Sequence, residues 1–144
     1  GVRLSPYGTF NDMYDSDPIT LFNYVLQQLS ARRIAYAHVI EPRSTGAGGN
    51  DAVVQDAPST SALFRSAFKG VFFSAGGYDR ASAINAVATG AVDAVVFGRL
   101  FISNPDLPAR LRVGVPLTPY DRATFYGGQE KGYTDYGVAV SDAA

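Results

Sequence analysis

The sequence contains no cysteine and a single histidine among its 144 residues. Without thiols the chain forms no disulfide, holds no metal through thiolates and has no cysteine nucleophile. One histidine also excludes a metal cage built from several histidines, so we expect no metal site. No apolar run approaches the ~20 residues that a membrane helix needs, and the N-terminus lacks the order of a secretory signal. We therefore expect a soluble cytoplasmic protein that does not bind membranes.

Charge of one sign is not in excess, because 12 Lys+Arg face 13 Asp+Glu and the formal net charge is -1. Such a chain offers no broad basic surface for nucleic acid. Hydrophobic residues make up 47% and charged residues 17%, which is too apolar for a disordered chain. The length suits one ordinary domain with one core.

Short apolar runs alternate with stretches of helical periodicity. Pro18 suits the first position of a helix that Ser16 or Asp17 would cap. Glycines and Pro58 indicate a long loop over residues 43–58. The predicted strands cover residues 2–5, 34–40, 70–73 and 94–97, and the predicted helices cover residues 18–33, 59–68, 80–89 and 105–111.

Alternating strands and helices predict parallel strand pairing through right-handed crossovers. The strands are nearly continuous apolar runs, which is typical of sheets covered on both faces. Two architectures fit: a small open α/β sheet, or half of a (β/α)8 barrel, which normally needs about 250 residues. The chain starts at Gly1 inside an apolar strand pattern, so we expect it to be a piece of something larger.

Ligands of parallel α/β proteins bind where the strands end, here at residues 3–6, 41–43, 75–77 and 98–99. Segments 75–77 and 98–99 follow consecutive strands and are rich in glycine, which lets backbone N–H groups approach a phosphate. A helix N-terminus after the loop adds positive potential, and Arg99 offers a bidentate clamp. These glycines would otherwise only serve tight turns, but their paired placement favours a phosphate site.

Other polar residues have simpler interpretations. Arg3 either meets a ligand or forms an ion pair with a carboxylate. His38 lies within a strand without Asp–Ser partners, so we interpret it as structural. Glu41 and Arg43 flank Pro42 and fit an orienting ion pair better than an acid–base couple.

Two further clusters need an interpretation. Asp12, Asp15 and Asp17 lack the glycine and the terminal glutamate of a calcium loop, so we expect a solvated loop and a helix cap. The tail from about residue 115 is turn-rich and aromatic. Its rings either pack in the interior or form a rim over a pocket.

Several long, irregular stretches resemble the old yellow enzyme family of FMN-dependent ene-reductases, which includes the 12-oxophytodienoate reductases. They are GVRLSPYGTF (1–10), HVIEPR (38–43), FSAGGYD (73–79), FGRLFISNPDLPARL (97–111), YDRATFYGG (120–128) and GYTDY (132–136). The resemblance covers essentially all of this chain but only the C-terminal half or less of a family member. It implies that residues 1–144 are strands 5–8 of a (β/α)8 TIM barrel, an α/β fold.

The resemblance also implies roles for particular residues. Arg3 matches the arginine at the flavin N1/C2-carbonyl edge, where a fixed cation stabilises the anionic reduced flavin. The positions that match FMN-binding residues are Arg3, Ala75, Gly76, Gly77, Gly98 and Arg99, and those that match the substrate pocket are Phe125 and Tyr126. Of these, 75–77 match the loop whose amides hold the FMN phosphate, and 98–99 match a second phosphate clamp, with Arg99 also lying along the flavin.

The implied reaction passes hydride from NAD(P)H to FMN and then to the β-carbon of an α,β-unsaturated carbonyl compound. The family's proton donor and carbonyl-binding pair come from the first half of the barrel, so no catalytic residue is expected here and the chain alone should be inactive. A half-barrel leaves two sheet edges unpaired, which is an aggregation hazard. We therefore expect a partner, either a complementary N-terminal half-barrel chain or a second copy.

Two alternatives stay open. One is a non-catalytic, self-associating half-barrel that binds a phosphate-bearing ligand. The other is a small phosphosugar-binding α/β protein, for which Glu41 is the nearest candidate catalytic carboxylate.

Overall fold

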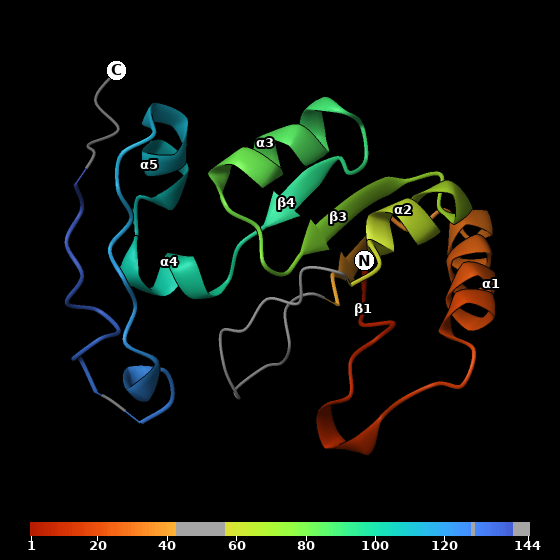
Figure 1. Ribbon diagram of the computed structural model, residues 1–144, viewed down its shortest axis with the longest axis horizontal. Coiled ribbons are helices and arrows are strands. Elements are labelled where there is room, and N and C mark those ends of the chain that lie inside the picture. The colour runs from red at the N-terminus through yellow and green to blue at the C-terminus, as the bar shows by residue number, and fades with distance from the viewer. Residues whose placement is uncertain (43–56, 128, 140–144) are drawn as a thin grey trace. The chain divides into compact units, whose positions relative to one another are not determined.

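The computed structural model describes residues 1–42, 57–127 and 129–139 (Figure 1). The predicted loop over residues 43–58 therefore lies largely outside the described residues. The chain divides into two compact units, Gly1–Val96 and Phe97–Ala144, which we call the sheet unit and the C-terminal unit. Within the described ranges, no helix has the length and apolar character needed to cross a membrane.

The sheet unit is built on four parallel strands in the order β1-β2-β3-β4. Their bounds are β1 Val2–Leu4, β2 Tyr36–Ile40, β3 Val71–Ala75 and β4 Ala94–Val96. The helices between them are α1 Pro18–Ala31, α2 Thr60–Phe64 with a 3-10 turn Arg65–Ala67, and α3 Arg80–Ala88 (Figure 1). This order confirms the predicted alternation and the parallel pairing, and it makes β1 and β4 the edge strands of the sheet in the described part of the chain.

Helix α1 begins where the sequence places it. The Asp17 carboxylate accepts a hydrogen bond from the backbone N–H of Thr20 at 3.1 Å, and Pro18 occupies the first turn. Hydrogen bonds from Thr20 lower the pKa of Asp17 below its ordinary value. After the helix, Arg33 adopts a left-handed conformation with φ 54°, so β2 begins at Tyr36 and not at Ile34 as predicted.

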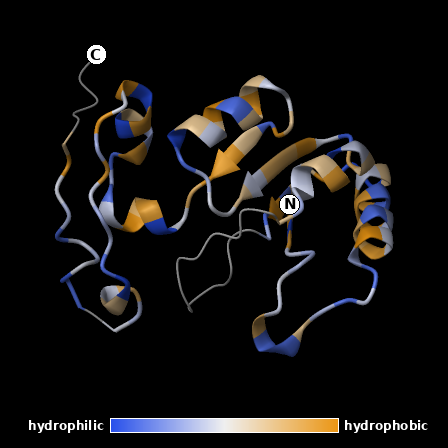
Figure 2. Ribbon diagram, in the orientation of Figure 1, coloured by the Kyte–Doolittle hydropathy of each residue, from blue (hydrophilic) through white to orange (hydrophobic). Residues whose placement is uncertain are grey.

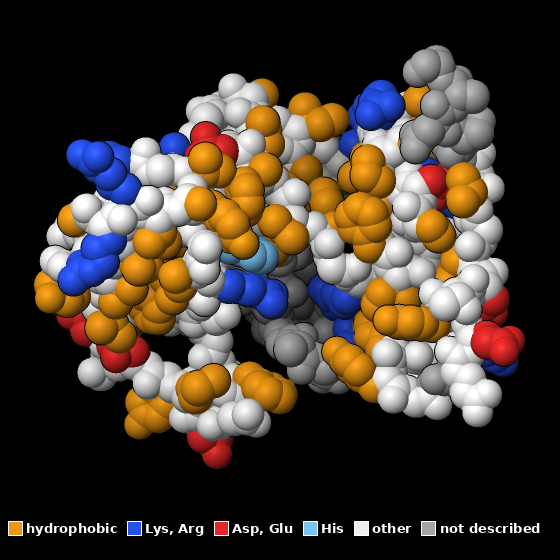
Figure 3. All heavy atoms as spheres, turned by 180° about the vertical axis from the view of Figure 1, so that it is seen from behind, with side chains coloured by type: hydrophobic (Ala, Val, Ile, Leu, Met, Phe, Trp, Pro, Cys, Tyr) orange, Lys and Arg blue, Asp and Glu red, His pale blue; other side chains and the backbone are white. Residues whose placement is uncertain are grey.

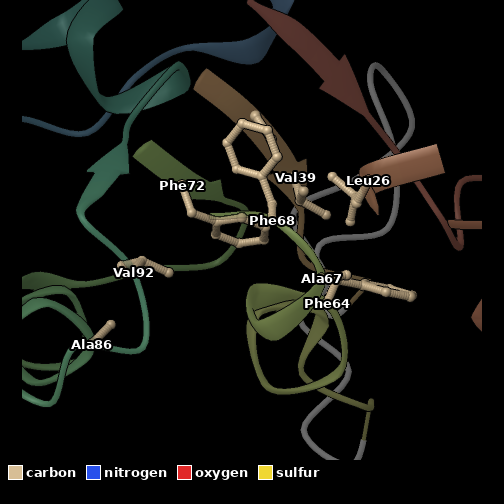
Figure 4. Close-up of a cluster of buried hydrophobic side chains, with 9 residues drawn as sticks. Leu26, Val39, Phe64, Ala67, Phe68, Phe72, Ala86 and Val92 are labelled. Carbon is tan, nitrogen blue, oxygen red and sulfur yellow. The ribbon is translucent and has the colours of Figure 1, made fainter. Parts of the chain in front are cut away.

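One face of the sheet carries the core of this unit. Side chains alternate along each strand, so Ala37 and Val39 of β2 face the same side of the sheet. Phe72 of β3, which pairs with Ala37, faces that side too. On that side they pack with fully buried residues of the helices and turns, as Figure 4 shows for Leu26, Phe64 and others. Figure 2 shows β3 and β4 as largely hydrophobic, in agreement with this burial.

The opposite face of the sheet is not covered by these helices, and we call it the open face. Register pairs Arg3 with His38 and His38 with Phe73, so these three side chains share it. The rings of Tyr36 and Phe73 stack there at 5.0 Å, yet Tyr36 stays 39% and Val71 44% exposed. In Figure 3 the single histidine, in pale blue, lies among hydrophobic side chains. In a closed barrel, side chains of this kind would be buried by facing strands.

In its described residues the C-terminal unit contains two short helices, α4 Arg99–Ser103 and α5 Leu107–Val113, and a 3-10 turn Arg122–Thr124. The sequence predicts one helix over 105–111, so α4 was missed. Helix α4 follows Gly98 at once, and five residues are too few to show the helical periodicity on which the prediction depends. Helix α5 ends at Gly114 in the left-handed conformation, φ 76°.

Buried polar side chains hold the C-terminal unit together. The Asn104 amide donates to the carbonyls of Leu100 (2.9 Å) and Thr118 (3.0 Å) and accepts from Thr118 N–H at 2.8 Å. Arg110, 4% exposed, pairs with Asp106 at 2.7 Å. Its remaining nitrogens donate to the Thr118 hydroxyl at 3.1 Å and the Gly137 carbonyl at 3.2 Å. These bonds fasten the extended segments around residues 118 and 137 to α5.

Candidate functional site

The carboxyl ends of β3 and β4 are neighbours in the sheet. Ala75, the last residue of β3, pairs with Val96, the last residue of β4. Strand β3 continues into Gly76 and Gly77, whose φ angles of 112° and 64° disfavour any residue with a Cβ. The predicted adjacency of the two strand ends is therefore confirmed, while Gly98 follows β4 in the other unit.

The loop after β3 ends in a capped helix. The Asp79 carboxylate accepts from the N–H of Ser82 at 2.8 Å, and the Ser82 hydroxyl accepts from the N–H of Asp79 at 3.0 Å. This reciprocal capping box closes the N-terminus of α3. Because a carboxylate already sits there, the helix adds less positive potential to the loop than the sequence predicts.

Arg3 and His38 lie side by side on the open face. Burial, and then the positive charge of Arg3, lower the pKa of His38 below its ordinary value. The His38 Nε2 atom is buried without a hydrogen-bond partner among the described residues. Arg3 is exposed, and no carboxylate of the described residues forms an ion pair with it. The pair therefore presents one cation and one unsatisfied ring nitrogen to whatever covers this face.

Glu41, the residue after β2, is a buried hydrogen-bond acceptor. Its carboxylate accepts from the backbone N–H groups of Thr60 (2.9 Å) and Ser61 (3.3 Å) at the start of α2. It also accepts from the Ser74 hydroxyl at 3.1 Å. The predicted ion-pair partner Arg43 lies outside the described residues. A carboxylate 3% exposed and engaged in this way is not available as the catalytic acid or base of a phosphosugar enzyme.

Sequence reasoning did not find this role of Glu41. The available signal was an acidic residue directly after an apolar strand, together with the run Ser59, Thr60 and Ser61 and the serine within the next strand. Donors of this kind are what a buried carboxylate needs.

Aromatic residues of the C-terminal unit form a cluster with Arg99. The Arg99 guanidinium lies 6.0 Å from the centre of the Tyr120 ring, a cation–π distance. Tyr120 packs on Phe125 at 5.3 Å, and Phe125 meets Tyr126 edge-on at 6.2 Å. The structure thus brings three predicted site residues, Arg99, Phe125 and Tyr126, into one aromatic cluster. Tyr126 is 90% exposed, so it is a surface ring and not interior packing.

The segment that follows this cluster folds back on itself. Asp121 N–H donates to the Tyr136 hydroxyl at 3.2 Å, and Gly132 N–H donates to the Asp135 carboxylate at 2.7 Å. A pocket of about 280 Å³ lies in this segment, and one tail aromatic, Tyr136, lines it. Its lining consists of Asp121, Thr124, Lys131, Gly132, Asp135 and Tyr136.

Comparisons of the sequence and of the structure with known proteins identify related flavin oxidoreductases. The sequence model of the NADH:flavin oxidoreductase / NADH oxidase family matches residues 1–118. A putative 12-oxophytodienoate reductase 12 of Oryza sativa subsp. japonica is 46% identical over 140 residues, which are 94% of this chain and 34% of that protein. Morphinone reductase in complex with tetrahydroNAD superposes with a TM-score of 0.82 at 36% identity, covering 100% of this chain and 37% of that one.

The old yellow enzyme from Trypanosoma cruzi superposes with a TM-score of 0.83 at 32% identity, covering 96% of this chain and 34% of that one. The chain thus spans about a third of the length of the relatives it matches. Its parallel α/β sheet corresponds to part of their TIM barrel. The resemblance predicted from the sequence is confirmed, and the chain belongs to the NADH:flavin oxidoreductase / NADH oxidase family, that of the old yellow enzymes.

Proposed function

We propose that this chain is the FMN-binding half of an NAD(P)H-dependent oxidoreductase that reduces the C=C bond of α,β-unsaturated carbonyl compounds. Residues 1–144 would form strands 5–8 of a (β/α)8 barrel, with an aromatic tail from about residue 115. Family membership and the nicotinamide analogue bound to morphinone reductase support the proposal.

The observation that carries the proposal is the pair of neighbouring strand ends, Ala75 and Val96. The first leads into Gly76 and Gly77, whose positive φ angles shape a turn free of side chains. Such a turn lets backbone amides approach an anion closely. Two and three residues beyond the second strand end come Gly98 and Arg99, whose planar guanidinium suits bidentate binding of the FMN phosphate.

The open face would receive the flavin ring. Arg3 places a permanent cation at the surface of this face, and the buried His38 Nε2 beside it has no hydrogen-bond partner among the described residues. A fixed cation next to the ring would stabilise the negative charge of the reduced form. Arg3 would thus tune the cofactor, while the loop at Ala75, Gly76 and Gly77 would hold its phosphate.

Bound FMN would supply hydride transfer, from NAD(P)H to the β-carbon of the enone. Phe125 and Tyr126 would border the substrate, because Tyr126 presents an almost fully exposed ring next to the cluster that holds Arg99. No residue of this chain is proposed as proton donor. That group would come from the other half of the barrel, without which the chain would be inactive.

Strands β1 and β4 have no further strand beside them among the described residues, which supports the need for a partner that completes the barrel. Each presents a row of backbone donors and acceptors, and the open face leaves Tyr36 and Val71 exposed. A complementary N-terminal half-barrel chain would pair with both edges and bury this face. A second copy of the chain is the other candidate partner.

Flavin titration tests the proposal. The chain, alone or co-expressed with the first half of a related barrel, should bind FMN and quench its fluorescence. Arg99→Met should weaken FMN binding about 10- to 100-fold, as expected for loss of a charge-assisted contact to phosphate. It should weaken binding of riboflavin, which lacks the phosphate, by a smaller factor. Arg112→Met, an exposed arginine of α5, is the matched control and should change neither. Failure to bind FMN in both preparations would overturn the proposal.

The sheet edges, which pair with no other strand of the described ranges, also support the second candidate, a non-catalytic half-barrel that associates with itself. Native mass spectrometry separates the two. A heterodimer carrying flavin supports the oxidoreductase, whereas a flavin-free homodimer supports the non-catalytic module.

A further inference from the structure

Tyr78, directly after the glycine turn, reaches back to the sheet. Its hydroxyl donates to the Ser74 hydroxyl at 3.1 Å and lies 3.4 Å from the same Glu41 oxygen that accepts from Ser74. Ser74 is fully buried and Glu41 is 3% exposed, so this hydrogen-bond group lies in the interior of the sheet unit. The hydroxyl therefore ties the loop after β3 to a fixed point.

Glu41 connects three parts of the sheet unit. Its backbone N–H donates to the carbonyl of Ala75 at 2.7 Å, directly before the glycine turn. Its carboxylate accepts from the first N–H groups of α2, at Thr60 and Ser61, and from the Ser74 hydroxyl, which in turn accepts from the Tyr78 hydroxyl. One buried side chain thus fixes the end of β2, the start of α2 and the loop after β3.

The glycine turn is consequently held on both sides. Before it, Ala75 is bonded to the Glu41 backbone; after it, Tyr78 is anchored through its hydroxyl and Asp79 closes the capping box of α3. Gly76 and Gly77 gain their conformational freedom from the missing Cβ and would lose order without such anchors. A preorganised turn binds an anion without having to be ordered first.

We propose that Glu41 and Tyr78 are positioning residues for the phosphate loop, with Glu41 acting through the Tyr78 hydroxyl. The inference rests on the proposed function for its ligand but not for its geometry. Neither residue would touch the phosphate; both would fix the direction in which the Gly76 and Gly77 amides point.

The test compares FMN with riboflavin, since only FMN has the phosphate. Tyr78→Phe keeps the ring and removes the hydroxyl, and it should weaken FMN binding about fivefold; Glu41→Gln should weaken it about tenfold. Riboflavin binding should stay within about twofold for both, because the loop would not touch the ring. Tyr24→Phe, on the exposed side of α1, is the matched control and should change neither affinity. The proposal would be overturned if the two variants lost equal affinity for FMN and riboflavin, or if they bound FMN as tightly as the unaltered chain.

Amide hydrogen exchange tests the positioning role without any flavin. In both variants, the peptide covering residues 75–79 should exchange faster while the peptides of β2 and β3 keep their protection. Unchanged exchange of the loop would overturn the positioning role even if FMN binds. If the unaltered chain binds no FMN, the proposed function fails, and the exchange result alone then decides whether Glu41 and Tyr78 order this loop.

Discussion

The two units of the chain are stabilised by different interactions. In the sheet unit, fully buried rings such as Phe64, Phe68 and Phe72 pack between helices and strands. In the C-terminal unit, Asn104 and Arg110 are buried instead, and each bonds to backbone groups of distant segments. Apolar burial is non-directional, whereas hydrogen bonds fix particular atoms at particular angles.

The secondary structure of each unit explains why one depends more on apolar burial and the other more on hydrogen bonds. Parallel strands already bond to one another, so the sheet unit depends mainly on cover for its apolar face, with the hydrogen bonds of Glu41 at the strand ends. The C-terminal unit has no sheet in its described residues and contains extended segments whose backbone groups require partners. Side chains such as Asn104 supply these partners, and they thereby fix the path of the chain that leads to Tyr120 and Phe125.

The largest expected effect is in the sheet unit. Phe68→Ala removes a fully buried ring and should lower the free energy of unfolding by about 4 kcal/mol, measured by urea unfolding with far-UV circular dichroism. Phe10→Ala, at a ring 58% exposed, is the control and should cost less than about 0.5 kcal/mol. Similar losses for both would contradict a core centred on Phe68.

Arg110→Met tests the C-terminal unit. It leaves the buried Asp106 carboxylate without its cation, and breaking such a pair should cost about 3 kcal/mol. Hydrogen exchange should become faster in peptides from residues 97–139 and stay unchanged in those of β2 and β3. Equally faster exchange in both units would show that Arg110 stabilises the whole chain and not the C-terminal unit in particular.

Asn104→Ala sharpens the same contrast. It leaves the N–H of Thr118 without its side-chain partner, although the Thr118 carbonyl still accepts from the Ser103 hydroxyl at 2.8 Å, and it should cost about 2 kcal/mol. The control, Asn85→Ala on the exposed surface of α3, should leave stability unchanged or slightly raised because alanine favours helix. If Asn104→Ala lowered the free energy of unfolding no more than Asn85→Ala, the hydrogen bonds of Asn104 would not stabilise the C-terminal unit.

The smallest effect concerns His38, on the open face of the sheet unit. Its pKa in the folded chain lies below the unfolded value of 6.5, so the unfolded state binds the proton more readily. Its contribution to stability is therefore present above about pH 6.5 and is lost as the pH falls through the folded pKa. The urea midpoint should fall more between about pH 7.5 and about pH 5.5 in the unaltered chain than in His38→Gln, which has no histidine.

Local patterns predicted the elements of the sheet unit well. The cap at Asp17, the order of strands and helices and the parallel pairing all follow from turn residues and apolar runs. The ends of strands were less accurate: β3 runs to Ala75 and not to Phe73, because Ser74 and Ala75 continue the pairing with Val39 and Ile40. Pairing depends on the neighbouring strand, which a local pattern does not contain.

The polar networks could not be predicted in this way. Glu41 meets Ser74 and Tyr78 across 33 and 37 residues, and Arg110 meets Gly137 across 27. Hydrophobic periodicity shows which residues are buried together but not which donor faces which acceptor. The same holds for the cluster of Arg99, Tyr120 and Phe125, whose members were candidates individually but not as a contact.

The two edges of the parallel sheet are complementary and not identical. Joining β4 of one molecule to β1 of the next is a head-to-tail contact, and contacts of this type either close into a ring or extend into a filament. A barrel of this kind closes at eight strands, which two four-stranded molecules supply. Association would therefore stop at two molecules, because the closed barrel has no free edge for a third.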